Sequence, residues 1–317
     1  MKVAVVFRNG EHSHDYLIQH LFAGFCDLLG EENILDYPRN PYCHLREITP
    51  GSRLPDPAAR DECNLDSDQA YPVVDVQGPF GLIIGGAHAP TETQEAIKQW
   101  PSATVAWIDG SDNACQNAGP GVQFKRELPI GATWAHPLPL TYPEHRIPKV
   151  KVERHGVVYY ASTHGDIAID RMRIAYGLRQ LPDARVHTTP NQKDRPSTEA
   201  HHEALWSALV GVHWNPLVPL DKMNEHSSGW DANRFPESLA FGVAVVALRP
   251  FITIPYPFTD GENIVYANTS DEVVSKVKEL LDNPERARAI GKAGHKHFLK
   301  YHCATARARY IIDLTGG

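Results

Sequence analysis

The sequence predicts an α/β protein of two domains, each built on a parallel sheet, that face each other across a cleft. Three observations support this fold class. The chain has 317 residues, which is enough for two hydrophobic cores. Short apolar runs, typical of buried strands, alternate with amphipathic helical segments. The alternation stops in a proline-rich stretch, 129–150, and then restarts. We expect an N-terminal domain over 1–145, a C-terminal domain over 146–300, and a final helical segment over 301–317 that is a candidate to pack back on the first domain.

The first half of the chain alternates strands and helices in order. Apolar runs predict strands over 3–7, 33–37, 81–85 and 103–108. Apolar residues at helical spacing predict helices over 17–29, closed by Gly30, and over 91–100, with Thr91 as N-cap. Residues 38–72 are rich in Pro, Asp, Arg and Ser without a clear period, and predict a long surface excursion. This order is typical of a doubly wound parallel sheet.

The second half repeats the pattern. Strands are predicted over 157–161, 185–188, 211–214 and 243–248, and helices over 167–181, 199–209 and 234–241, the last closed by Gly242. Thr269, three residues before Glu272, is a capping-box signal for a further helix. Asn283 as N-cap and Pro284 at the first helical position begin the next helix. An amphipathic helix over 304–314 ends the chain.

Composition and charge exclude several classes of protein. The charged fraction of 22% and the hydrophobic fraction of 42% are those of an ordinary globular chain. Residues 1–150 carry 11 Lys and Arg against 19 Asp and Glu, a net charge of −8, and the remainder carries 20 against 19, or +1. No long basic face for nucleic acid follows from this distribution. The five cysteines lack the spacing of metal ligands. No apolar segment is long enough to span a membrane. We therefore expect a cytoplasmic protein, in the host cytoplasm if a phage encodes it.

The segment 228–242 is the most informative part of the sequence. A glycine-containing loop leads into a predicted helix, then into a glycine and a buried strand. The free N–H groups at the start of such a helix favour an anion such as a diphosphate. Arg234 in the first turn supplies a charge-assisted hydrogen bond, and Glu237 one turn later is suited to a ribose diol.

This segment resembles the donor-binding segment of GT-B glycosyltransferases, in particular the spore-maturation-protein-like (CgeB-like) branch with its Arg-x-x-Glu-x-x-Ala-x-Gly pattern. Here the pattern runs from Arg234 through Glu237 and Ala240 to Gly242. The downstream stretches 260–266 and 283–285 continue the resemblance, which covers about 157–312 and is weaker in the first half. It implies two Rossmann-like domains of the GT-B type. Many retaining relatives carry a second Glu eight positions after the first, where this chain has Val245, so the stereochemical outcome stays open.

The resemblance also implies a donor site in the second domain. A nucleotide-sugar, in the first place a UDP-sugar, is the expected co-substrate, with no tightly bound cofactor. Glu237 would bind the ribose and Arg234 would lie near the diphosphate, while Arg171 and Trp214 are candidates for phosphate contact and base stacking. Two loops would supply the remaining contacts. The loop before the 234–241 helix carries Gly229, Asp231 and Asn233, and the loop after the 243–248 strand carries Glu262 and Asn263.

The first domain is expected to hold the acceptor and the general base, because base candidates follow its predicted strands. The preferred pair is His88 and Asp112, and the other candidates are Asp109, His12 and Asp15. Acceptor contacts are expected from Arg8, Asn9, Glu11, His14, Arg39 and Arg46. Asp66-Ser67-Asp68 imitates a metal-binding Asp-x-Asp motif, but it lies in the aperiodic stretch, and a helix dipole with Arg neutralises a leaving diphosphate without metal.

The leading hypothesis is therefore an enzyme of the hexosyltransferase kind that moves a sugar from a nucleotide-sugar to a hydroxyl of a glycan or similar acceptor. One alternative is a DNA glycosyltransferase that acts on 5-hydroxymethylcytosine, with an arginine series in 39–60 along the phosphate backbone. A second alternative is a nucleotide-sugar 2-epimerase, which needs no acceptor. The sugar, the acceptor and the oligomeric state stay open.

Overall fold

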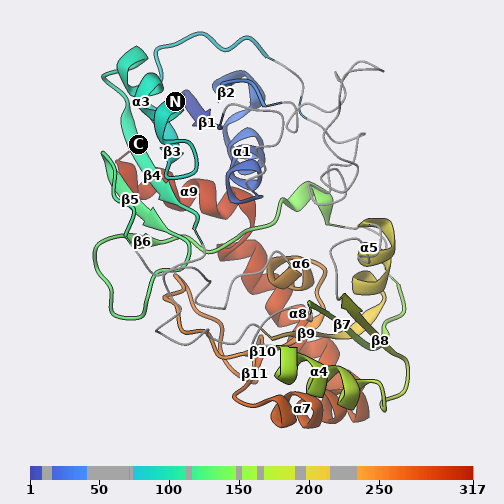
Figure 1. Cartoon of the computed structure of the whole chain (residues 1–317). Helices are drawn as coiled ribbons and strands as arrows, with labels where there is room; N and C mark the ends of the chain where they lie inside the picture. Colours follow the sequence, from blue (N-terminus) through green and yellow to red (C-terminus); the bar gives the residue numbers. More distant parts are fainter. Residues whose placement is uncertain are drawn as a thin grey trace. The chain divides into compact units, whose positions relative to one another are not determined.

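A computed structural model of the chain describes residues 1–8, 16–40, 71, 74–111, 116–147, 152–162, 168–189, 198–214 and 234–316. The contacts divide the chain into two compact units. Unit 1 comprises 1–145 together with 303–317, and unit 2 comprises 146–302. Each unit is built on one sheet of parallel strands, labelled in Figure 1.

The sheet of unit 1 has the strand order β2-β1-β3-β4-β5-β6, and its neighbouring strands are parallel. Its strands are β1 (Val3–Val6), β2 (Ile34–Tyr37), β3 (Leu82–Gly86), β4 (Thr104–Asp109), β5 (Val122–Lys125) and β6 (His136–Pro137). Its helices are α1 (Tyr16–Leu29), α3 (Pro90–Gln99) and α9 (Ala304–Thr315), with short 3-10 turns at Glu31–Asn33 and Glu144–Arg146.

Alternate residues of these strands pack on opposite faces of the sheet, as the two-residue period of a strand requires. Val3 and Val5 belong to the cluster that contains the apolar residues of α1 and α9. Ala4 and Val6 belong to the cluster that contains Ala96 of α3. Helices therefore cover both faces of the sheet, which explains why the central strands β1 and β3 carry no polar side chain.

The packing of α1 against α9 depends on a glycine. A Cβ atom at Gly24 of α1 would lie 2.2 Å from the carbonyl oxygen of Ala304 at the start of α9. The backbone N–H of Ala304 donates to the carbonyl of Tyr142, 3.1 Å away. The backbone of α9 at Ala304 therefore contacts α1 and the chain at Tyr142 directly, which holds residues 304–315 in unit 1.

The sheet of unit 2 has the order β11-β10-β9-β7-β8 and is parallel as well (Figure 1). Its strands are β7 (His155–Ser162), β8 (Ala184–Thr189), β9 (Ala208–His213), β10 (Ala244–Leu248) and β11 (Val265–Ala267). Its helices are α4 (Ala168–Leu178), α5 (Thr198–Trp206), α6 (Arg234–Ala240), α7 (Ser270–Asp282) and α8 (Pro284–Tyr301).

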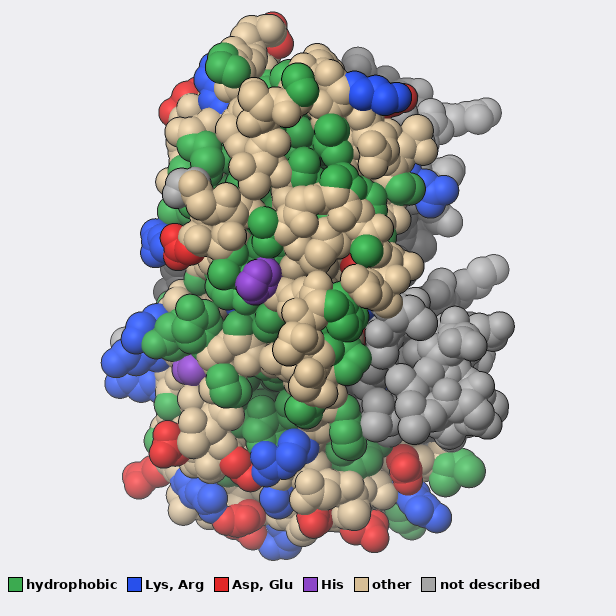
Figure 2. All heavy atoms as spheres, turned by 90° about the vertical axis from the view of Figure 1, so that its left-hand side faces the viewer, with side chains coloured by type: hydrophobic (Ala, Val, Ile, Leu, Met, Phe, Trp, Pro, Cys, Tyr) green, Lys and Arg blue, Asp and Glu red, His purple; other side chains and the backbone are tan. Residues whose placement is uncertain are grey.

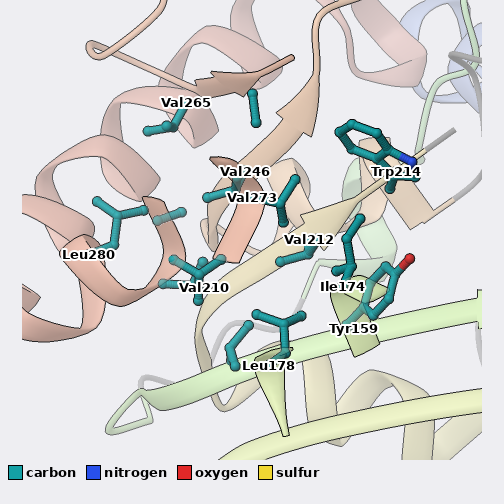
Figure 3. Packing of buried hydrophobic residues seen from close by; sticks show 14 of the residues in the cluster. Tyr159, Ile174, Leu178, Val210, Val212, Trp214, Val246, Val265, Val273 and Leu280 are labelled. Atoms are coloured by element: carbon teal, nitrogen blue, oxygen red, sulfur yellow. The ribbon is translucent and has the colours of Figure 1, made fainter. Parts of the chain in front are cut away.

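The core of unit 2 lies between the sheet and helices α4 and α7. Val210 and Val212 of β9 pack with Ile174 of α4 and Val273 of α7 (Figure 3). The intervening Gly211 faces the other side, where an added Cβ would contact Ser238 of α6 at 3.4 Å. The site helix α6 therefore lies on the sheet face opposite α4 and α7.

The structure confirms the α/β class and the parallel sheets, and it corrects several element boundaries. Helix α3 begins at Pro90 after Ala89, so the prediction of Thr91 as N-cap is wrong. Thr269 and Asn283 are N-caps that accept the backbone N–H groups of Glu272 and Arg286, as predicted. Residues 208–209 belong to β9 and not to the preceding helix. The short strands β5 and β6 were not predicted.

None of the described helices is long and apolar enough to cross a lipid bilayer.

Candidate functional site

Arg234, the first residue of α6, reaches the end of β7. Its Nη1 donates to the carbonyl of Tyr160 at 3.3 Å, and its guanidinium carbon lies 5.2 Å from the centre of the Tyr160 ring. A hydrogen bond and a cation–π contact to the same residue fix the plane of the guanidinium. A guanidinium held in this way, at the carboxyl end of a parallel strand, is suited to phosphate oxygens.

Glu237 lies one turn further along α6 and is only 4% exposed. Nε2 of His201 in α5 lies 2.9 Å from its Oε2. Burial by itself raises the pKa of Glu237, but the hydrogen bond from His201 and the charges of His201, His202 and Arg234 outweigh burial and hold this pKa below its ordinary value. The carboxylate is therefore ionised at neutral pH and accepts hydrogen bonds only.

His213 ends β9 and lies against α6. Its Nε2 is 2.9 Å from Oγ of Ser238, and its ring packs edge-on against Phe235 at 5.6 Å. Burial, reinforced by the charge of Arg234, lowers the pKa of His213 to about 3. His213 is thus a neutral group in the floor of the site.

Three buried polar atoms at this end of the unit 2 sheet have no hydrogen-bond partner among the described residues, namely Oη of Tyr159, Oη of Tyr160 and Nε1 of Trp214. The Tyr159 and Trp214 atoms point to the same side of the core in Figure 3. Nε of Arg171 in α4 donates to the carbonyl of Trp214 at 3.4 Å. Burial raises the pKa of Tyr159, while the charges of Arg171 and Arg234 oppose that rise, so both cations lie near this hydroxyl. An unpaired buried polar group costs about 1–3 kcal/mol, which favours a polar ligand at this position.

The loop between β10 and β11 is fixed by its own side chains. Oδ1 of Asn263 accepts the backbone N–H of Thr259 at 2.8 Å. Oδ1 of Asp260 accepts the backbone N–H of Tyr266 at 2.9 Å, and its Oδ2 pairs with Arg249 at 3.1 Å. Glu262 is exposed. Of the two residues expected to approach a donor from this loop, Asn263 thus uses its side-chain oxygen to hold the turn.

Unit 1 has a pocket of about 510 Å³ where β3 and β4 end. This volume lies in the range of small-molecule sites. The pocket brings together two of the predicted base candidates, His88 and Asp109, and its other lining residues include Ala87, Pro90, Trp107, Ser111 and Asn117.

His88 is held in one tautomer. Its Nε2 lies 2.8 Å from the carbonyl oxygen of Val6, and a carbonyl only accepts, so Nε2 carries the proton. Nδ1 is buried and has no hydrogen-bond partner among the described residues. His88 lines the pocket, and a ring nitrogen without a partner among the described residues makes it a candidate general base.

Asp109, in contrast, is already engaged. Its Oδ2 lies 2.9 Å from Nζ of Lys125, and both side chains are almost fully buried. Its two oxygens also accept hydrogen bonds from Ser111 and Asn117. Lys125 donates in addition to the carbonyl and hydroxyl of Ser111. Through this network of hydrogen bonds and one ion pair, Asp109 stabilises the conformation of the loop after β4.

Of the other predicted site residues, Arg8 and Arg39 are exposed in unit 1. The remaining ones lie outside the described residues: Asn9, Glu11, His12, His14, Asp15, Arg46, Asp112, Gly229, Asp231 and Asn233. Asp66 and Asp68 of the Asp-x-Asp stretch also lie outside them. Within the described part of the chain, no three His, Cys, Asp or Glu side chains gather as metal ligands would.

Three further residues of the site, Tyr159, Tyr160 and His201, are not predicted by the sequence patterns. Tyr159 and Tyr160 are adjacent polar-tipped residues that follow the apolar pair Val157 and Val158 in β7, which is a signal that polar groups meet at the strand end. His201 precedes His202 in α5, but nothing in their spacing indicates that one of them contacts Glu237, 36 residues away.

Comparison with known proteins places these features in context. Residues 171–313 match the family model described as "Glycosyl transferase-like". A search among curated protein sequences finds no match.

Solved structures show the fold. Anabaena Alr3699/HepE in complex with UDP aligns over 100% of both chains with a TM-score of 0.59 at 8% identity. A glycosyltransferase from Rickettsia africae ESF-5 aligns over 99% of this chain and 97% of its own, with a TM-score of 0.55 at 8% identity. The fold is of the GT-B type.

A third structure, TarM of S. aureus, aligns over 74% of this chain with a TM-score of 0.50 at 10% identity. The chain spans 55% of the length of TarM. The family match covers residues 171–313 only, and the structural similarity at 8–10% identity shows the fold.

Proposed function

We propose that the protein is a hexosyltransferase that moves a sugar from a UDP-sugar to a hydroxyl acceptor, and that it is a relative of the CgeB-like branch. The observation that carries this proposal is the pair on α6: a fixed guanidinium at Arg234 and, one turn later, the buried ionised carboxylate of Glu237. A cation and an anion at this spacing match the two ends of a ribose diphosphate, whose phosphates need donors and whose diol needs an acceptor.

In this proposal unit 2 binds the donor. Glu237 accepts hydrogen bonds from the ribose hydroxyls, and Arg234 and Arg171 neutralise the diphosphate. The unpaired polar atoms of Tyr159 and Trp214 lie at the same end of the sheet and supply further contacts. HepE, which shares the fold at 8% identity, binds UDP and UDP-glucose in its crystals, and this favours uridine as the base. The two arginines also stabilise the charge that develops on the leaving UDP.

Unit 1 supplies the base. As the acceptor oxygen forms its bond to the anomeric carbon and the bond from that carbon to the phosphate breaks, Nδ1 of His88 takes the proton of the acceptor hydroxyl and UDP leaves. The hydrogen bond from Nε2 to Val6 stabilises the resulting imidazolium, because the carbonyl dipole points at its N–H. We choose His88 over Asp109, whose oxygens are occupied by Lys125, Ser111 and Asn117.

A glycan or a small hydroxyl compound fits as acceptor better than DNA. On the face shown in Figure 2, Lys and Arg side chains alternate with Asp and Glu and form no continuous basic stripe among the described residues. The charge of −8 over residues 1–150 repels a phosphate backbone. Of the arginines considered for a DNA path, Arg39 is exposed on unit 1 and the others lie outside the described residues.

The test is donor consumption. The protein is incubated with a panel of UDP-sugars, and free UDP is followed with glycan acceptors, with small alcohols, and with DNA that contains 5-hydroxymethylcytosine. UDP release that depends on a glycan or alcohol supports the proposal. UDP release that requires the modified DNA would identify DNA, in place of a glycan or alcohol, as the acceptor. Conversion of the donor to its 2-epimer without any acceptor, or no binding of UDP by calorimetry, overturns the proposed function.

A further inference from the structure

A group of aromatic and imidazole side chains lies behind the α6 pair. Tyr160 of β7 contacts Arg234 through its carbonyl and its ring face. The same ring stacks on His187 of β8 at 4.7 Å with 11° between the planes, and it meets the ring of His201 edge-on at 4.6 Å. His201 in turn contacts Glu237 at 2.9 Å. One residue, Tyr160, therefore supports both Arg234 and the partner of Glu237.

The contact between His201 and Glu237 lies in a protected place. The side chain of His201 is 12% exposed and that of Glu237 is 5% exposed. Because an ionised carboxylate has no proton, Nε2 of His201 is the donor. The rings of Tyr160 and His202 flank that of His201, so its rotamer is restricted by packing as well as by the hydrogen bond.

We propose that His201 is a positioning residue of the donor site, which keeps Glu237 ionised and in place so that the carboxylate accepts the ribose hydroxyls. This inference rests on the proposed function for the ribose role of Glu237. It goes beyond the proposed function by assigning which side chain keeps this buried carboxylate charged. Without His201, the burial of Glu237 would favour the protonated acid, whose O–H donates a hydrogen bond and which accepts fewer hydrogen bonds than the carboxylate.

Other charged and titratable groups face Glu237 from each neighbouring element. Arg234 lies on its own helix, His202 on α5, Tyr160 on β7 and His213 on β9. His213 is neutral, since burial lowers its pKa to about 3, and Tyr160 is neutral, since burial raises its pKa to about 12. Arg234 and His202 act on Glu237 through their charge, whereas His201 supplies a hydrogen bond as well. Removal of His201 thus takes away the strongest single contribution that opposes burial.

The experiment measures UDP binding by calorimetry from about pH 7.5 to about pH 5, above the ordinary range of a glutamate. The proteins are the full chain, His201→Phe, His201→Gln and the control Glu203→Gln, an exposed residue of the same helix. For the full chain and Glu203→Gln we expect a flat profile. For His201→Phe we expect affinity lower by roughly 10-fold or more at neutral pH, because a hydrogen bond to a charged group is lost, and a further decrease as the pH falls. His201→Gln retains an N–H donor and recovers most of the affinity.

Turnover gives a second readout. At saturating donor, His201→Phe keeps the kcat of the full chain while its KM for the donor rises, because the residue does not touch the reacting atoms. Equal affinities and equal pH profiles for the full chain and His201→Phe would overturn the inference and leave the proposed function standing.

Failure of the full chain to bind UDP would instead overturn the proposed function. The positioning role is then decided by unfolding. The contribution of Glu237 to the unfolding free energy is measured as the effect of Glu237→Gln, once in the unsubstituted chain and once in His201→Phe. This contribution disappears as the pH falls, and in His201→Phe it must disappear at a higher pH. No change in that pH refutes the inference.

Discussion

The carbonyl oxygen of Val6, at the end of β1, lies 2.8 Å from Nε2 of His88, just beyond the end of β3. The two strands are neighbours in the unit 1 sheet, with Val5 opposite Ile84. The backbone of one strand thereby fixes the tautomer of an imidazole that follows the other. Because the acceptor is a main-chain atom of a buried strand, a side-chain substitution at Val6 does not remove it.

Replacement of His88 by Ala is expected to lower kcat by about 10²–10⁴-fold, the usual contribution of a general base, with the donor KM within about twofold of its starting value. UDP release at saturating donor and acceptor measures both constants. His136→Gln, which changes a half-buried histidine outside the pocket, serves as the control. A His88→Ala protein with normal kcat would remove His88 from the role of base.

Replacement of Glu237 by Ala is expected to raise the donor KM by on the order of 10–100-fold, because the ribose hydroxyls lose an ionised acceptor. Initial rates against UDP-sugar concentration give the KM, and calorimetry with UDP gives the matching loss of affinity. Glu153→Ala removes an exposed carboxylate of the same unit and should leave both constants unchanged. An unchanged KM in Glu237→Ala would exclude the ribose role.

Asp109 and Lys125 should matter to stability more than to chemistry. Removal of one partner, as in Lys125→Met or Asp109→Asn, leaves a buried charge without its counterion and is expected to cost about 3–5 kcal/mol of unfolding free energy. The double variant should cost less than the sum of the two single ones. Urea unfolding monitored by fluorescence tests this expectation. Strictly additive costs would show that the two residues act independently.

His213 should make the protein sensitive to acid. Its pKa in the folded state is lowered to about 3 by burial, whereas an unfolded histidine titrates near about 6.5. Between these values the unfolded chain binds one proton more than the folded protein. Protonation therefore favours unfolding, and this histidine lowers stability by about 1.4 kcal/mol per pH unit as the pH falls from about 6.5 towards 3.

The measurement for His213 is the unfolding free energy of His213→Gln against the unsubstituted chain at several pH values. The amide retains a partner for Ser238 but does not titrate, so the variant should lose less stability on acidification. Parallel curves for the two proteins would show that His213 does not set the acid sensitivity.

Much of the architecture follows from sequence patterns. The buried runs of β1, β3 and β10 are apolar throughout, and that of β4 is apolar up to Asp109, so they predict strands in parallel sheets, as the 234–241 pattern predicts a helix. The same reasoning placed His88 and Asp109 after neighbouring strands, and the structure brings both to one pocket.

The misses have physical reasons. The strand β5 carries Lys125, which is buried only because Asp109 on β4 pairs with it, and a single sequence does not reveal such a partner. The strand β6 is two residues long, too short for any period. Residues 208–209 are apolar, like the end of the preceding helix and the start of β9. In a continuous apolar run, periodicity does not show where the helix ends and the strand begins. The contact of His201 with Glu237 joins separate elements and depends on tertiary packing.

The return of α9 to unit 1 affects the order in which the chain acquires structure during synthesis. Unit 2 is continuous, so all of its residues have been synthesised once position 302 is made. Unit 1 begins at the N-terminus, yet it lacks the helix that packs on α1 until residues 304–315 have been synthesised. The domain that is translated first is therefore the one completed last, and a ribosome that stops after 302 releases a chain with one finished domain and one with an uncovered apolar face.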